Sequence, residues 1–179
     1  MESRYYRHWH LAKDETELNI TELEYSVIRF QEAFSRWIIT IGELTGSSGL
    51  KHGEHVMLHV IRMQDRPKST ATIARLINRD DMPNIQYSLR KLESEGLVRK
   101  KKEKGTKNFV YEITARGEQI TDEYAKIRAE MLTKNLRALA DIDQRTAQAA
   151  QTLSIMTAIY EESARNAASF NHDLKDANS

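Results

Sequence analysis

The sequence predicts a mainly α-helical protein with one small β-hairpin, and three observations support this prediction. Apolar residues recur every three or four positions over much of the 179-residue chain, which is the spacing of one helix face. Residues 69–117 combine two short helical segments with a run of alternating strand-like residues. Long amphipathic segments flank this stretch on both sides. We therefore expect a small central lobe between helical extensions.

The first extension is a helix predicted over residues 20–46, after an N-terminal arm of residues 1–19. Its apolar residues are spaced alternately by three and four positions, a heptad pattern that persists for 25 residues. Thr21 precedes Glu24 by three positions, as in a capping box at a helix start. A helix with such a stripe must bury it. The residues expected in a homodimer interface here are Ile20, Leu23, Val27 and Phe30.

A Gly/Ser-rich break at residues 46–53 leads into a second helix, predicted over residues 51–63. His52, His55 and His59 fall on one face of it. Two imidazoles one turn apart can chelate Zn²⁺, but no cysteine or matched carboxylate completes a ligand set, so no metal or cofactor is expected. The alternatives for this face are an ordinary polar surface near a subunit junction and a contact that responds to pH.

Residues 70–78 and 83–95 are predicted to form two further helices joined by a tight corner. Ser69 or Thr70 would cap the first helix with a side-chain oxygen. Pro83 fits the first turn of the second helix, because its missing N–H needs no partner there. The residues expected to face the core are Ile73, Leu76 and Ile77 from the first helix and Ile85, Leu89 and Leu92 from the second.

A basic β-hairpin follows, with its turn at residues 104–106. The residues that alternate on its return strand are Phe109, Tyr111 and Ile113. Six of the nine residues from 99 to 107 are basic. The wing cations expected to act are Lys100, Lys101, Lys102, Lys104 and Lys107. Two helices followed by such a hairpin form the layout of a winged helix-turn-helix, which we assign to residues 50–117 as a DNA-binding domain.

Two helices are predicted after the hairpin, over residues 118–140 and 143–168, and residues 118–170 are assigned to dimerisation. Asp141 would cap the last helix. Residues 171–179 are expected to form a frayed polar tail. The residues of the last helix expected in the dimer interface are Leu153, Met156 and Tyr160.

Three short motifs occur in order within the central lobe. Residues 72–76 read Thr-Ile-Ala-Arg-Leu, residues 89–98 read Leu-Arg-Lys-Leu-Glu-Ser-Glu-Gly-Leu-Val, and residues 113–117 read Ile-Thr-Ala-Arg-Gly. They resemble motifs of the MarR family of bacterial transcription regulators, whose patterns include L-x-x-L-E-x-x-G-L-V and L-T-x-x-G. The wing turn departs from the family, because the usual Asp-x-Arg pair near its tip is missing. The resemblance implies a winged helix-turn-helix fold, DNA binding and a dimer.

Binding to double-stranded DNA requires a helix that fits the major groove and cations that meet phosphates. Amide side chains can pair with adenine and arginine with guanine. Base contacts are therefore expected from Asn84, Gln86, Tyr87 and Arg90. Phosphate contacts position the protein on DNA but do not specify the base sequence. They are expected from Ser69, Thr72, Arg75 and Lys91. A two-fold homodimer would place two such helices about 34 Å apart on a pseudo-palindromic operator.

The resemblance also implies a small aromatic or anionic effector that binds between the dimer helices and the DNA-binding lobe. The residues that would line such a pocket are Trp37, Ile41, His55 and His59. Ordinary core packing is the alternative for each of them. Repression is the default expectation for the regulation, since no activation domain is visible in the sequence.

Charge is unevenly distributed, although the net charge is only +1. Residues 62–116 hold 14 basic and 7 acidic residues, whereas the rest of the chain holds 13 basic and 19 acidic residues. This asymmetry is typical of a protein that binds a polyanionic partner at one surface only. The sequence has no cysteine nucleophile or glycine-rich phosphate loop, which argues against an enzyme. No apolar run approaches the roughly 20 residues that span a membrane, so we expect a cytoplasmic protein without a membrane partner.

The main alternative is a winged helix that contacts proteins without reading bases. Such modules tend to lose surface charge on the second helix and wing, whereas this chain keeps it. RNA binding would use the same lysines, but the aromatic platform that stacks single-stranded bases is absent from the sequence. The basic run could also serve only to keep a hairpin solvated, for which fewer charges would suffice.

Overall fold

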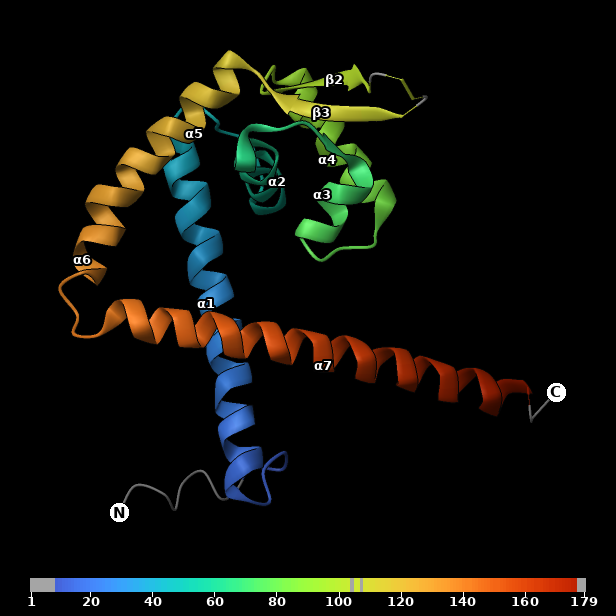
Figure 1. Ribbon diagram of the computed structural model, residues 1–179. Helices are drawn as coiled ribbons and strands as arrows, with labels where there is room; N and C mark the ends of the chain where they lie inside the picture. The colour runs from blue at the N-terminus through green and yellow to red at the C-terminus, as the bar shows by residue number, and fades with distance from the viewer. Residues whose placement is uncertain (1–8, 104, 107, 177–179) are drawn as a thin grey trace. The chain divides into compact units, whose positions relative to one another are not determined.

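The computed structural model describes residues 9–103, 105, 106 and 108–176, with side chains described as far as residue 170 (Figure 1). It divides into two compact units, Met1–Ile127 and Arg128–Ser179. The predicted fold class is confirmed, because the chain is mostly helical with one small antiparallel sheet. Within the described residues, every helix is too short or too polar to cross a membrane.

The first helix, α1 (Glu15–Leu44), begins earlier than predicted. The Asp14 carboxylate caps it by accepting a hydrogen bond from the backbone N–H of Glu17 at 2.9 Å. The expected cap, Thr21, lies inside the helix, where its hydroxyl donates to the Glu17 carbonyl. The prediction of a start at Thr21 was wrong because the apolar pattern begins later than the capping chemistry. Of the expected N-terminal arm, residues 1–8 lie outside the described residues.

The central lobe follows the predicted order of elements. It contains α2 (His52–Arg62), α3 (Thr70–Leu76), α4 (Met82–Ser94) and the hairpin strands β2 (Val98–Lys102) and β3 (Phe109–Ile113). A short strand that was not predicted, β1 (Lys68–Ser69), pairs antiparallel with β3, so the strand order is β1-β3-β2. Two residues are too few to show an alternating pattern in the sequence. In Figure 1 the hairpin lies at one end of the lobe, beside α2, α3 and α4.

Apolar side chains from all three helices of the lobe and from its hairpin meet in one core. As predicted, α4 contributes Ile85, Leu89 and Leu92, each 0% exposed. From α3, Ile73 and Ala74 are buried, but Leu76 is 43% exposed, so its assignment to the core was wrong. The physical reason is that α3 turns the side with Ile73, Ala74 and Ile77 toward the core, which leaves Leu76 at the edge of the buried face.

The C-terminal half of α1 is covered by α2 and by α5 (Ala115–Arg128). Ile38 and Ile41 are each 2% exposed and pack with Tyr124 of α5. The indole N–H of Trp37 donates to the Tyr124 hydroxyl at 3.2 Å. This second core joins α1 to the lobe.

The helix predicted after the hairpin is interrupted. After α5 comes a π-helical segment (Ala129–Thr133) and then the short helix α6 (Lys134–Leu136). Met131 is 57% exposed in the π-helical segment. The wider turn of a π-helix interrupts the 3.6-residue period, which the regular spacing in the sequence does not reveal.

The last helix, α7 (Ile142–Asp176), extends further than predicted. It follows Asp141, whose backbone φ of 56° is left-handed and separates it from the preceding turn. The expectation of a frayed tail was wrong for residues 171–176, because this segment contains no glycine or proline to end a helix. Residues 177–179 of that tail lie outside the described residues.

Candidate nucleic-acid interface

The exposed surface of α4 is organised as two polar stripes beside its buried face. Residues three, four and seven positions apart share a side of a helix. The stripe toward the hairpin carries Gln86, Arg90 and Glu93. The other stripe carries Asn84, Tyr87 and Lys91, of which Lys91 reaches α2. The sequence placed four of these residues together as base contacts, whereas the structure distributes them over two sides.

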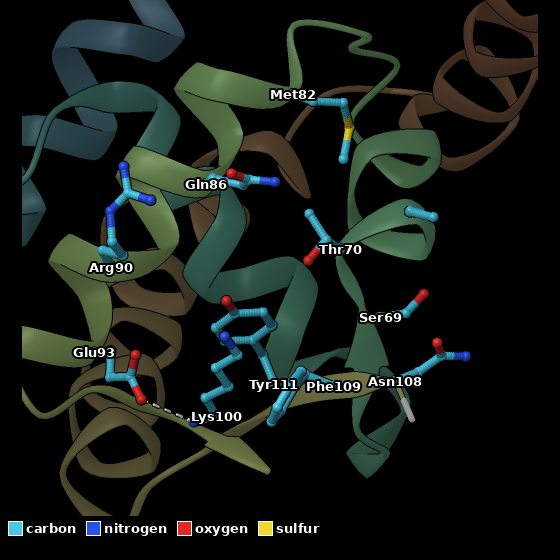
Figure 2. A pocket seen from close by; sticks show the side chains of 11 residues that line it. Ser69, Thr70, Met82, Gln86, Arg90, Glu93, Lys100, Asn108, Phe109 and Tyr111 are labelled. Atoms are coloured by element: carbon cyan, nitrogen blue, oxygen red, sulfur yellow. Dashed lines mark hydrogen bonds between the residues drawn. The ribbon is translucent and has the colours of Figure 1, made fainter. Parts of the chain in front are cut away.

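A groove of about 620 Å³ separates α4 from the start of α3 and from the hairpin (Figure 2). The side chains in Figure 2 come from all of these elements and face a common space. The residues that line the groove are Ser69, Thr70, Ala71, Met82, Gln86, Arg90, Glu93, Lys100, Asn108, Phe109 and Tyr111. Amide, hydroxyl and cationic groups dominate this set, so the groove suits a polar partner with negative charge.

Lys100 is held at the hairpin side of this groove. Its ammonium lies 4.3 Å from the centre of the Phe109 ring, a cation–π contact. The Glu93 carboxylate accepts a hydrogen bond from the backbone N–H of Lys100 at 3.3 Å, so it also fixes the strand to α4. Burial, with a further contribution from Glu93, raises the pKa of the Tyr111 hydroxyl.

The start of α3 has the cap that the sequence predicted. The Ser69 hydroxyl accepts a hydrogen bond from the backbone N–H of Thr72 at 3.1 Å, and the two hydroxyl oxygens lie 3.0 Å apart. Arg75 is exposed in the last turn of α3. The cap is therefore confirmed, and contact of these three residues with phosphate stays a prediction.

Tyr87 and Lys91 differ sharply although they share a stripe. Tyr87 is 60% exposed, and Asn84 is also exposed near the start of α4. The Lys91 ammonium instead donates to the Glu54 carboxylate at 2.9 Å and to the carbonyl of Gly49 at 2.6 Å. The lysine expected to meet phosphate thus has two partners within the protein.

The hairpin presents different charges on its two faces. Glu112 pairs with Arg99 and lies 3.7 Å from the ammonium of Lys101, so these cations are partly neutralised. Strand alternation places Lys100 and Lys102 on the opposite face from that pair. Lys104 and Lys107, also expected in the wing, lie outside the described residues.

The residues expected around an effector lie where α1, α2 and α5 pack together. Trp37, Ile41 and His59 meet around Tyr124, whose ring centre is 4.4 Å from that of His59. His55 is 3% exposed and lies so close to α1 that a Cβ added to Gly42 would be 2.2 Å from its ring. The groove beside α4 is lined by other residues.

The histidines of α2 have separate surroundings. His52 packs edge-on to Phe34 at 5.6 Å between ring centres. Burial, with a smaller contribution from the charge of His55, lowers the pKa of His59 to about 4. Burial also lowers the pKa of His55, against an opposing effect of Glu54. Within the described part of the chain, no group of three or more histidine or carboxylate side chains is arranged to hold a metal ion.

The residues expected in a dimer interface are largely exposed in the single chain. In α1, Phe30 is 70% exposed, Ile20 42% and Val27 37%, whereas Leu23 is half-buried. Leu153 and Tyr160 of α7 are 39% and 48% exposed, and Met156 is half-buried. Exposed apolar side chains in such numbers are typical of surfaces that bury against a partner.

Two residues of structural importance were missed from the sequence. The ammonium of Lys68 is buried and donates to three backbone carbonyls, including those of Ile61 and Arg66, each at 3.1 Å. A lysine beside a proline turn gives no sequence signal for this arrangement. Glu54 is also buried, and its carboxylate accepts from the backbone N–H of Lys51 at 2.6 Å. Its position three residues after the helix cap could have predicted that contact.

Comparison with known proteins adds family and fold information. Residues 50–117 match the family model of a winged helix DNA-binding domain. The comparison with curated proteins found no match.

Solved structures with a similar fold include the transcriptional regulator BldR from Sulfolobus solfataricus. It is 17% identical, with a TM-score of 0.64 over 79% of this chain and 98% of that chain. The complex of S. aureus MepR with DNA is also 17% identical, with a TM-score of 0.58 over 74% of this chain and 95% of that chain. A MarR family transcription regulator is 14% identical, with a TM-score of 0.60 over 83% of this chain and 99% of that chain. At these identities the likeness establishes the fold.

Proposed function

We propose that this chain, which has the fold of the MarR-type transcriptional regulators, is itself a sequence-specific regulator that binds double-stranded DNA as a homodimer. The observation that carries the proposal is the exposed polar surface of α4 beside a groove with cationic side chains. Tyr87 is 60% exposed, and Arg90 is exposed at the wall of the groove. A single helix of this kind fits the major groove of B-DNA.

In this proposal α4 is the recognition helix. The residues assigned to base edges are Asn84, Gln86, Tyr87 and Arg90, because amide and guanidinium groups can distinguish adenine and guanine. Ser69, Thr72 and Arg75 would contact backbone phosphates from α3, and Lys100 and Lys102 would do so from the hairpin. Phosphate contacts would fix the position of the helix without specifying sequence.

A homodimer would let the protein read two half-sites. The exposed apolar residues of α1, with Phe30 at 70%, support such an interface, and Leu153, Met156 and Tyr160 of α7 would add to it. Two recognition helices about 34 Å apart would then enter successive major grooves of a pseudo-palindromic operator.

Regulation would be repression by occupancy of the operator in the bacterial cytoplasm, relieved by a small aromatic or anionic effector. The effector would bind where α1, α2 and α5 meet, near Trp37, Ile41, His55 and His59. Isothermal titration of the protein with a panel of aromatic acids tests this part. A heat of binding that the wild type shows and the Trp37→Leu variant lacks would support an effector site here. No heat of binding with any of the acids would contradict it.

Selection of bound duplexes from a random DNA pool at near-physiological salt tests the central proposal. Enrichment of an inverted repeat with half-sites about one helical turn apart is the expected result. Arg90→Ala should relax selection at one base position, and the matched cation variant Lys102→Ala should weaken all duplexes alike. Binding without any enriched sequence would contradict base reading by α4.

A further inference from the structure

Lys91 and Glu54 form a polar connection between the recognition helix and the start of α2. The Lys91 ammonium lies 2.9 Å from the Glu54 carboxylate and 2.6 Å from the carbonyl oxygen of Gly49. The same carboxylate oxygen accepts a hydrogen bond from the backbone N–H of Lys51 at 2.6 Å. Side-chain exposure is 4% for Glu54 and 26% for Lys91. The pair is therefore mostly withdrawn from water.

Burial makes this pair different from an ion pair on the surface. A carboxylate taken out of water is costly unless its oxygens are paired and hydrogen-bonded. Glu54 meets this requirement through one lysine and one backbone N–H. Loss of Lys91 would leave a buried charge without its counter-ion, so α4 would be displaced rather than merely lose one contact.

The loop that Lys91 contacts is itself tied to the end of α1. The backbone N–H and the hydroxyl of Ser47 both donate to the carbonyl of Gly42, at 2.9 and 3.0 Å. Gly49, which accepts from Lys91, has a left-handed φ of 89°. A side chain there would be strained, so the loop conformation that presents this carbonyl depends on glycine. The recognition helix is thus anchored to a well-defined turn between α1 and α2.

Two directional contacts add to the apolar contacts of α4, from Glu93 to the backbone N–H of Lys100 on the hairpin side and from Lys91 to Glu54 on the other side. Ile85, Leu89 and Leu92 hold α4 against the lobe by apolar burial. Such burial depends on area and has no preferred direction. Hydrogen bonds from Lys91 act at a fixed angle on the side of α4 that carries Tyr87. These hydrogen bonds therefore fix the rotation of α4 about its own axis. The same rotation sets the direction of the side chains that would face DNA.

We infer that Lys91 and Glu54 are positioning residues that fix the orientation of the recognition helix, so that Lys91 acts on DNA binding through Glu54 and Gly49 and not by contact with a phosphate. The inference rests on the proposed DNA-binding function. It reverses the role that the sequence suggested for Lys91, which was an outward cation on a basic helix.

The charge of Glu54 provides the sharpest test. Removal of a carboxylate from a DNA-binding protein should strengthen binding if charge alone matters. We expect the opposite for Glu54→Gln, with binding to the selected duplex weakened about tenfold, since misalignment of one base contact costs roughly that much. The matched variant Glu95→Gln removes the same charge from the exposed end of α4 and should bind as well as the wild type or slightly better. Tighter binding by Glu54→Gln would overturn the inference.

Salt dependence separates the two possible roles of Lys91. For each variant the affinity is measured for the selected duplex and for a scrambled duplex between about 50 and 200 mM salt, the range over which released counterions dominate. Lys91→Met should weaken the selected duplex about tenfold, lower the ratio of specific to non-specific affinity, and leave the salt slope unchanged. The control Lys102→Met should weaken both duplexes alike and reduce the slope by about one.

Folding and the proposed function are checked in the same experiment. Far-UV circular dichroism and the midpoint of thermal unfolding establish that each variant is folded at the temperature of the binding assay. Should Lys91→Met not fold, Lys91→Gln, which loses the charge but can still donate to a carboxylate, is used instead, and the inference then predicts an unchanged salt slope and a smaller loss of the affinity ratio. A slope reduced by about one in the Lys91 variant, with equal loss on both duplexes, would make Lys91 a phosphate ligand and overturn the inference while DNA binding stands. A wild-type protein that binds neither duplex would overturn the proposed function itself.

Discussion

The core face of α4 and the N-terminal half of α1 carry equally regular apolar patterns but differ in what covers them. In α4, Ile85, Leu89 and Leu92 are each 0% exposed. In α1, Ile20, Val27 and Phe30 are 42%, 37% and 70% exposed. The same spacing of apolar residues therefore produced a closed core in one place and an open surface in the other.

A single helix contains the same contrast. Further along the stripe of α1, Ile38 and Ile41 are 2% exposed because Tyr124 and other residues of α2 and α5 pack against them. Periodicity determines that one face of a helix is apolar, whereas the cover depends on which other segments reach it. An apolar face left uncovered within the chain is best explained by a partner, which supports the proposed homodimer.

The largest effect is expected from a cavity in the closed core. Leu89→Ala should lower the free energy of unfolding by about 3–5 kcal/mol, since a fully buried leucine loses both transfer energy and packing. Denaturant unfolding followed by circular dichroism measures this. The matched variant Leu44→Ala, at a position 67% exposed, should change stability little. Equal losses in the two variants would contradict the distinction between covered and uncovered faces.

A charge in the open stripe should act on assembly and leave folding intact. Phe30→Asp should weaken dimerisation by about 30-fold or more, because central aromatic residues of interfaces contribute about 2–4 kcal/mol. Sedimentation equilibrium measures the effect, with circular dichroism to show that the helices remain. The control Arg36→Asp introduces the same side chain at a residue with 73% side-chain exposure away from the stripe, and should remain dimeric. A Phe30→Asp protein that stays dimeric would show that α1 is covered in another way.

Acid should destabilise the packing around the C-terminal half of α1, because the histidines buried there resist protonation. The pKa of His59 is lowered from 6.5 to about 4, so the unfolded chain takes up the proton at a higher pH than the folded chain. Stability from this group is complete above pH 6.5 and declines as the pH falls toward 4, by an amount on the order of 3 kcal/mol. Burial shifts His55 in the same direction.

His59→Gln should flatten the dependence of the unfolding free energy on pH between 6.5 and 4. NMR titration of the His59 ring protons measures the pKa directly. A midpoint near 6.5 would show that the second core around Tyr124 admits a charged imidazole, and would remove the basis for this prediction.

The smallest effect concerns the cap of α3. Ser69→Ala removes the hydrogen bond from the Thr72 N–H at 3.1 Å and should cost about 1 kcal/mol. Ser69→Thr, which retains the hydroxyl, should recover most of that loss in the same unfolding assay. A loss unchanged by threonine would indicate that the side-chain contact with Thr72 is not what stabilises the start of α3.

The groove beside α4 could be predicted only in part. Ser69 as a cap, the basic hairpin and the outward Gln86 and Arg90 follow from local spacing and turn chemistry. The partition of α4 into two polar stripes follows from which neighbour each side meets. That neighbour is the hairpin for Arg90 and the start of α2 for Lys91. A helical pattern identifies an exposed side chain without identifying its neighbours.

The sequence by itself determined the order of helices and strands, the apolar faces and the winged layout, because these depend on residues within a few positions of one another. The tertiary structure decided which apolar stripe is covered, how β1 joins the sheet, and where the charges of Lys68 and Lys91 go. Lys91 meets its partners across 37 and 42 residues of chain. Contacts over such separations depend on how the folded elements pack, and no local pattern records them.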